Sequence, residues 1–452
     1  MKLFECQNCG QPLYFENTTC ESCGLRLGYL PEPEVVTALE EVDGSLRALA
    51  APGERYQFCA NARHNVCNWL VNCDQAEVFC AACRHNRTIP DLANSENLLH
   101  WRKIEFAKHR LFYTLLRLRL PLATRLEDPN GLAFDFLSNP IGAAAAHSRV
   151  LTGHASGLIT LNVAEADDPE RERQRKSMGE PYRTLLGHFR HEIAHYYWDR
   201  LVADSPRIDD FRRLFGDERE DYEASLQRYY ADGPAPDWPE RFVTSYASSH
   251  PWEDFAETWA HYFHMIDTLE TAFAFGLRLR PKVAKGADLS TAIDFDPYIS
   301  EMDRIIDAWL PLTFAANSLN RSMGQPDLYP FIVPPPVIWK LTLIHDLIHA
   351  AGSGRQPGNS GNDALRAVVA GLKRSIGSPQ STIWAPERSG SFGRSLNHRS
   401  SRPGQGSENH SRRANGRPEN CIENCVNMSG PLQHDPEKLQ TLRTGSCDQG
   451  SR

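Results

Sequence analysis

Two pairs of cysteines stand at the start of the chain, Cys6-x2-Cys9 and Cys20-x2-Cys23, and nine of the twelve cysteines lie within the first 83 residues. Thiols are kept reduced in the cytosol, so clustered cysteines of an intracellular protein are more often metal ligands than disulfides. Four thiolates in two such pairs can close a tetrahedral structural Zn²⁺ site with no open position. We therefore expect residues 1–30 to form a zinc ribbon.

A less regular cysteine group follows in residues 31–95. Its members are Cys59, Cys67, Cys73, Cys80 and Cys83. We predict a second four-thiolate site from Cys59, Cys67, Cys80 and Cys83, with Cys73 as a spare buried thiol. The spacing does not decide which cysteine is left over, and His64 could take the place of one as a ligand. The chain would thus hold one or two structural zinc ions.

The length of 452 residues exceeds what one hydrophobic core usually serves, so we expect two or more folded units. No stretch approaches the roughly 18 uninterrupted apolar residues of a membrane span. The first ten residues, MKLFECQNCG, lack the apolar core of a signal peptide. These features predict a cytoplasmic protein with no membrane partner.

The net charge of −8 is unevenly distributed, because residues 353–452 carry 14 Lys and Arg against 8 Asp and Glu. This segment is rich in Ser, Gly, Asn, Arg and Pro and cannot bury enough apolar surface to offset the entropy of ordering, so we predict a disordered, low-complexity tail. The preceding part is strongly acidic and would repel nucleic acid over most of its surface. A zinc ribbon commonly binds nucleic acid or protein, so a nucleic-acid partner stays open there, while the oligomeric state is not indicated.

Residues 96–352 have the patterns of a mixed α+β domain. Apolar residues at helical spacing predict a long amphipathic helix over 95–125. The segment GLITLNV, 157–163, is apolar and β-branched and predicts a strand. Further helices are expected over the following ranges: 181–203, 217–230, 251–275, 296–320 and 337–351.

The helix over 181–203 contains His191-Glu192-x-x-His195. Side chains four residues apart lie on one helix face, so both imidazoles can bind one Zn²⁺. Glu192 would lie beside the ion and act as a general base, taking a proton from a zinc-activated water and later protonating the leaving amine. The five residues can also occur by chance in a structural helix, so a third ligand is needed to support the site.

The helix over 251–275 offers Glu253 and Glu257, one turn apart. If one carboxylate binds the ion, the other can accept a hydrogen bond from a ligating histidine and fix its tautomer. The alternative is a solvated acidic stripe near a helix N-terminus, which the helix dipole favours. The spacing alone leaves these two interpretations equal.

A resemblance bears on this choice. The pair HEIAH and YASSHPWEDFAE is similar to the glutamate-zincin metallopeptidases, in which a glutamate from a downstream helix joins the HExxH motif. The resemblance implies that Glu253 is the third ligand and Glu257 the carboxylate that orients a ligand. It also implies that Tyr246 donates a hydrogen bond to the oxyanion; otherwise Tyr246 would be a buried aromatic residue packed on its neighbours.

Residues 1 to about 350 also resemble a bacterial family of zinc-binding metallopeptidases with an N-terminal zinc ribbon. The similar segments are CQNCGQPLYFEN, CNWL, CRHNRTIPDL, HFRHEIAHYYWDRLV and SHPWEDFAETWAHY. We therefore expect zinc-ribbon modules followed by a zincin-like α+β domain that hydrolyses peptide bonds of a peptide or protein substrate. The alternative is a non-catalytic zinc-ribbon protein that binds a protein or nucleic-acid partner and keeps HExxH as a structural site.

Three further expectations concern individual elements. The strand 157–163 would lie near the active-site helix, and an extended peptide would pair with its edge. The pair His345 and His349 in the last helix is interpreted as structural, because no third acidic helix follows it. His188 and His261 flank the motif helices and are interpreted as satisfied polar residues of the core.

Overall fold

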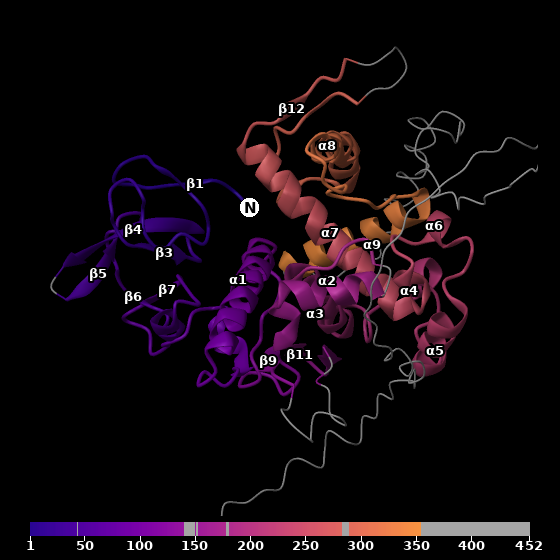
Figure 1. The fold of residues 1–452 in the computed structure, drawn as a ribbon, viewed down its shortest axis with the longest axis horizontal. Helices are drawn as coiled ribbons and strands as arrows, with labels where there is room; N and C mark the ends of the chain where they lie inside the picture. Colours follow the sequence, from indigo (N-terminus) through magenta and orange to yellow (C-terminus); the bar gives the residue numbers. More distant parts are fainter. Residues whose placement is uncertain (43, 140–149, 151, 178–179, 283–288, 354–452) are drawn as a thin grey trace, which may run out of the picture. The chain divides into compact units, whose positions relative to one another are not determined.

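The computed structural model describes residues 1–42, 44–139, 150, 152–177, 180–282 and 289–353 (Figure 1). The predicted tail lies outside the described residues from position 354 onward. The mixture of helix and sheet that the sequence predicts for the preceding part is confirmed.

The N-terminal region is built from short antiparallel strands. β1 (Phe4–Glu5) pairs with β2 (Pro12–Leu13), and β3 to β7 form a five-stranded sheet in sequence order. A backbone bridge between Tyr29 and Trp69 brings the two ends of that sheet together. The strands of the larger sheet are β3 (Leu27–Leu30), β4 (Val35–Val42), β5 (Ser45–Ala48), β6 (Arg55–Phe58) and β7 (Leu70–Asn72).

β3 belongs to the first predicted zinc module and β4 to the second. They pair antiparallel, with Leu27 opposite Ala38 and Leu30 opposite Val35. The residues of β3 are all buried, and both β3 and β4 contribute to two apolar clusters: Leu27 and Ala38 belong to the main core, and Leu30 and Leu39 to a smaller cluster. The cysteine segments are therefore joined by backbone hydrogen bonds and by packing.

A second sheet lies in the C-terminal region, with the strand order β10-β11-β9-β8. β9 runs parallel to both of its neighbours, whereas β10 pairs antiparallel with β11. Its strands are β8 (Asn86–Thr88), β9 (Ala133–Leu137), β10 (Gly153–Ala155) and β11 (Leu158–Asn162).

The predicted strand over 157–163 is present as β11, but the expectation that its edge is open is wrong. The three-residue strand β10 covers that edge, with His154 opposite Ile159. The turn between them places Ser156 and Gly157 at positive φ, which permits a tight reversal. Among the described residues, β10 is therefore the outer strand on this side of the sheet.

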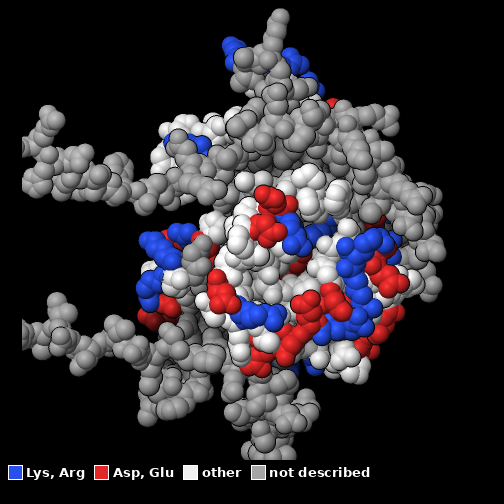
Figure 2. All heavy atoms as spheres, turned by 90° about the vertical axis from the view of Figure 1, so that its right-hand side faces the viewer, with Lys and Arg blue, Asp and Glu red and all other residues white. Residues whose placement is uncertain are grey.

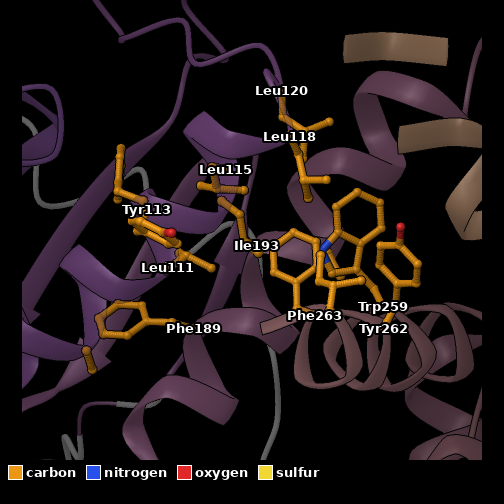
Figure 3. Packing of buried hydrophobic residues seen from close by; sticks show 14 of the residues in the cluster. Leu111, Tyr113, Leu115, Leu118, Leu120, Phe189, Ile193, Trp259, Tyr262 and Phe263 are labelled. Atoms are coloured by element: carbon orange, nitrogen blue, oxygen red, sulfur yellow. The ribbon is translucent and has the colours of Figure 1, made fainter. Parts of the chain in front are cut away.

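The helices α1 (Ser95–Arg117) and α3 (Leu185–Leu201) pack beside this sheet, and α7 (Pro251–Ala274) packs against α3. Phe189 of α3 packs against Phe134 of β9 with ring centroids 5.7 Å apart. α3 and α7 meet through Tyr197 and Trp259, which stack at 5.2 Å. Figure 3 shows the apolar side chains of these helices meeting in one buried cluster.

Further helices and strands surround α1, α3 and α7. The predicted helices over 217–230, 296–320 and 337–351 are observed as α5, α8 and α9 with shifted ends. The remaining helices and strands are α2 (Asp168–Ser177), α4 (Ile208–Phe215), α5 (Tyr222–Asp232), α6 (Trp238–Arg241), α8 (Met302–Ser322), α9 (Pro335–Gly352), β12 (Arg278–Leu279) and β13 (Thr291–Ala292). Short 3-10 turns are η1 (Ala60–His64), η2 (Cys83–His85), η4 (Val163–Ala166), η5 (Tyr246–Ser248) and η6 (Pro297–Ile299). Within the described part of the chain, every helix is too short or too polar to cross a lipid bilayer.

Candidate metal centre

The motif residues lie on α3, which begins after the N-cap Thr184. The hydroxyl oxygen of Thr184 accepts a hydrogen bond from the backbone N–H of Gly187 at 3.0 Å, a common way of satisfying the first turn of a helix. His195 is buried, and His191 and Glu192 are partly exposed. His191 and His195 are one helical turn apart and lie on the same face of α3, and Glu192 is the next residue round the helix.

α7 brings the two glutamates to the same place. Its N-cap His250 accepts a hydrogen bond from the backbone N–H of Trp252 at 3.1 Å, and Pro251 occupies the first turn, where its missing N–H costs nothing. Glu253 follows and is almost fully buried. One ligand atom each from His191, His195 and Glu253 lies within 4.8 Å of the other two.

Glu257 fixes the ring of His191. The Nδ1 atom of His191 lies 2.7 Å from Oε1 of Glu257, and the hydroxyl of Thr244 donates to Oε2 of Glu257 at 2.8 Å. Because a carboxylate only accepts, Nδ1 carries a hydrogen, so a metal ion would take the place of any proton on Nε2. Such an arrangement is typical of metal-binding histidines.

The atoms inside the site fit a cation. Nε2 of His191 lies 3.0 Å from Oε2 of Glu253, and Nε2 of His195 lies 3.7 Å from Oε1 of Glu253. Within the described residues, Oε2 of Glu253 is buried without a hydrogen-bond donor. Two imidazole nitrogens and a carboxylate are the donor set of catalytic zinc sites, which keep a fourth position open.

The surroundings shift the pKa values of Glu253 and Glu192 in opposite directions. Burial acts to raise the pKa of Glu253, but His195, His191 and Tyr222 outweigh it and lower the value to about 2. Burial raises the pKa of Glu192 to about 7, and the charge of His191 opposes that rise. Glu253 therefore stays a carboxylate, whereas the proton affinity of Glu192 suits exchange with water near neutral pH.

Two tyrosines border the site. The ring centroids of Tyr246 and His191 lie 6.1 Å apart. Burial, followed by the negative charges of neighbours such as Glu253 and Glu192, raises the pKa of Tyr246 well above its usual value. Tyr246 is therefore a neutral hydrogen-bond donor. The hydroxyl of Tyr222 donates to Oε1 of Glu253 at 2.7 Å, a contact that the sequence did not indicate because the two residues lie on different helices.

His154 is another neighbour that the sequence did not indicate. It lies on β10, and its ring is nearly parallel to that of His195 at a centroid distance of 6.2 Å. Its Nε2 accepts a hydrogen bond from the backbone N–H of Gly157 at 2.9 Å. Burial lowers the pKa of His154 to about 3, so this histidine is neutral at physiological pH.

The four cysteines of the first predicted site converge at the protein surface. Cys6 and Cys23 have their sulfur atoms 3.7 Å apart, and those of Cys9 and Cys20 are 3.6 Å apart. Hydrogen bonding from the backbone of Leu25 lowers the pKa of Cys23 to about 6, which favours the thiolate that a metal requires. Cys9 is exposed and Cys23 partly so.

The second group converges in the interior. The ligand atoms of Cys59, Cys67, Cys80 and Cys83 all lie within 4.8 Å of one another, and all four residues are buried. Cys73 is partly exposed and does not belong to the group. His64 instead receives a hydrogen bond from Arg63 at 2.9 Å, so the structure does not bring it to the sulfur atoms.

Two other histidines are hydrogen-bonded to tyrosine hydroxyl groups. Nδ1 of His345 lies 2.9 Å from the hydroxyl of Tyr262, and Nδ1 of His261 lies 2.6 Å from that of Tyr329. Nδ1 of His188 lies 3.5 Å from a carboxylate oxygen of Glu165 but is buried without a hydrogen bond within the described residues, so the expectation that His188 is a satisfied core residue is wrong. The metal-binding groups found among the described residues do not include the pair His345 and His349.

Comparison with known proteins decides the family. Residues 97–347 match the sequence model of a family described as "Putative zinc-binding metallo-peptidase", and residues 3–94 match a zinc-ribbon domain. The chain belongs to this zinc-binding metallopeptidase family. The boundary between the two matches falls just before α1, so the ribbon contains both cysteine groups and the peptidase region contains α3 and α7.

Three mycobacterial proteins are similar over most of the chain. An uncharacterized protein of Mycobacterium bovis and two of Mycobacterium tuberculosis are each 43% identical over 365 residues, which cover 80% of this chain and 99% of each relative. No solved structure matches the chain significantly. The family is thus established by sequence, and its description supports zinc as the metal.

Proposed function

We propose that this protein is a zinc-dependent metallopeptidase that hydrolyses amide bonds of a peptide or protein substrate. The observation that supports the proposal best is the convergence of His191, His195 and Glu253 within 4.8 Å. Glu253 lies 58 positions after His195 in the sequence and on a different helix. The three side chains therefore meet because of the tertiary fold and not because of local spacing. A zinc ion held by them would polarise the scissile carbonyl and acidify a water molecule.

Three residues around the ion would have separate roles in the reaction. Glu192 would take the proton of the attacking water and transfer it to the leaving amine, for which a pKa of about 7 is well suited. Tyr246 would donate its hydroxyl hydrogen to the oxygen on which negative charge develops. Glu257 holds the ring of His191 at 2.7 Å, so it acts as a positioning residue.

The substrate would lie in extended form beside β10. An extended peptide can add to an outer strand by backbone hydrogen bonds, and β10 carries His154, whose ring stacks beside that of His195. The proposed peptide would therefore pass close to the metal centre. This replaces the earlier expectation for the strand over 157–163, which is covered by β10.

A protein or peptide suits the surface better than a nucleic acid. Figure 2 shows Lys and Arg side chains interspersed with Asp and Glu on the visible described face rather than gathered into one basic area. A polyanion is bound through a concentration of positive charge.

We infer in addition a cytoplasmic location and three zinc ions, one catalytic and one in each cysteine group.

The function can be tested with a peptide library and two zinc-loaded proteins, wild type and Glu192→Gln. New peptide termini are identified by mass spectrometry, and zinc content is measured in the same samples. We expect cleavage by the wild type and a loss of about 10²-fold or more in the variant, with equal zinc. Equal cleavage by both proteins would show that Glu192 is not the base, and absence of cleavage by both would favour the non-catalytic alternative.

A further inference from the structure

The second cysteine group has a neighbour outside the ribbon. His109 of α1 lies in the region that matches the peptidase family, and its side chain is only 4% exposed. Its Nε2 lies 3.3 Å from the sulfur of Cys67, 3.7 Å from that of Cys83 and 3.9 Å from that of Cys80. The ring thus faces three of the four predicted ligands.

The other nitrogen of the ring is already engaged. Nδ1 of His109 lies 2.6 Å from the backbone oxygen of Glu105. A carbonyl oxygen only accepts, so Nδ1 donates and the ring is held in one orientation. The ring also packs against Trp69 at a centroid distance of 5.1 Å. His109 is therefore fixed with Nε2 directed at the sulfurs.

The residues around the second cysteine group include hydrogen-bond donors to its sulfur atoms. Four thiolates around one Zn²⁺ carry a net charge of −2, and a buried anion of this kind needs hydrogen bonds and positive charge nearby. Three backbone N–H groups, of Trp69, Cys80 and Cys83, each lie 3.4 Å from a cysteine sulfur. Lys108 is also buried beside the group, but its charge is shared with Glu105 at 2.9 Å, and a carboxylate oxygen of Glu105 lies 3.9 Å from the sulfur of Cys83.

We propose that His109 belongs to the second cysteine site as an imidazolium, in which both ring nitrogens donate. Its Nδ1–H is held by the carbonyl of Glu105, its Nε2–H caps the thiolates of Cys67, Cys80 and Cys83, and the bound zinc fastens the ribbon to α1. Cys59, Cys67, Cys80 and Cys83 fill a tetrahedral site, so Nε2 lies outside the ligand set as a hydrogen-bond donor to sulfur. The first cysteine site, which lies at the surface, has no counterpart of His109 among the residues that the structure describes.

The contact between His109 and the second cysteine site also affects the peptidase region, because α1 is hydrogen-bonded to α7. The hydroxyl of Thr114 donates to Asp267 at 2.8 Å, and the hydroxyl of Tyr113 donates to Glu270 at 2.7 Å. Figure 1 shows α1 between the strands of the ribbon and the helices α3 and α7. A zinc ion secured by His109 would therefore anchor the helix against which the peptidase helices pack.

The proposal is tested by the protection of cysteines in the full-length, zinc-loaded protein. The protein is treated with EDTA and N-ethylmaleimide, and the labelling of each cysteine is followed by mass spectrometry. We expect His109→Leu, which keeps volume but removes the donor, to speed labelling of Cys59, Cys67, Cys80 and Cys83 by about 10- to 100-fold. Labelling of the first site should not change.

Two further variants keep the test decisive. His109→Gln retains an N–H donor and should fall between wild type and His109→Leu, and His100→Leu on the same helix should behave as wild type. Labelling of the second site at the wild-type rate in His109→Leu would overturn the proposal. If both cysteine sites were labelled faster in both His109 variants, the residue would serve the fold in general and the proposal would also fail.

Discussion

The hydroxyl of Tyr222 donates a 2.7 Å hydrogen bond to Oε1 of Glu253, the proposed third ligand of the catalytic ion. This bond fixes a carboxylate that would otherwise rotate, and residues that orient ligands typically contribute 10- to 100-fold to metal affinity. We therefore predict that Tyr222→Phe weakens zinc binding at this site by roughly that factor. Competition with a chromophoric chelator measures the change.

The matched control for that variant is Tyr229→Phe. Tyr229 lies on the same helix, and its hydroxyl contacts Ser245 at 3.3 Å rather than a ligand. Its zinc affinity should equal that of the wild type. Equal affinities in both tyrosine variants would mean that Tyr222 does not support Glu253.

Tyr246 should respond differently from Tyr222. If it stabilises the oxyanion, Tyr246→Phe removes a donor needed only in the transition state, which typically costs about 10²- to 10³-fold in kcat. Zinc content and KM should change little. A loss of zinc in this variant would assign Tyr246 to the structure of the site instead.

Glu257 is expected to act through His191. Glu257→Gln replaces the carboxylate that lies 2.7 Å from Nδ1, so zinc affinity should fall by about 10- to 100-fold. Thr244→Val removes only the hydrogen bond to the far oxygen of Glu257 and should have a smaller effect in the same direction. The prediction fails if Thr244→Val weakens zinc binding more than Glu257→Gln.

Asp267 joins three helices and should matter for stability. It is paired with Arg190, and the hydroxyl groups of Thr114 and Tyr298 donate to it at 2.8 and 2.6 Å. Asp267→Ala leaves a buried guanidinium without its partner, which typically costs about 3–5 kcal/mol. Urea unfolding measures the loss, with Asp294→Ala, from an exposed ion pair with Arg304, as a control that should change little.

The pH dependence of stability should contain a contribution from His345. Burial lowers its pKa to about 3, below the ordinary value of 6.5. The neutral ring is favoured in the fold, so its full stabilisation is present above pH 6.5 and is lost as the pH falls from 6.5 towards 3. His345→Gln should make the free energy of unfolding less dependent on pH between 6.5 and 5, and an unchanged slope would contradict this.

The sequence predicted those parts of the site that depend on local spacing. His191 and His195 are one helical turn apart, and the cysteine pairs are each three residues apart, so short patterns reveal them. Glu253 and Glu257 needed the resemblance to a known family, because spacing alone left a solvated stripe equally acceptable.

Contacts made by tertiary packing could not be predicted in this way. Tyr222 lies 31 residues before Glu253, and His154 reaches His195 only because β10 folds back on β11. The strand β10 is three residues long and has no alternating apolar pattern, so the outer edge of the sheet was assigned to the wrong strand. His109 did leave a signal, since Glu105, Lys108 and His109 place polar residues on a buried face of α1.

Anomalous diffraction at the zinc edge from crystals of the zinc-loaded protein tests the catalytic site most directly. We predict a peak bound by Nε2 of His191, Nε2 of His195 and a carboxylate oxygen of Glu253, each at about 2.0–2.2 Å. Further peaks should lie within the two cysteine groups. Peaks in the cysteine groups with none between these three side chains would contradict the proposal that this protein is a zinc peptidase.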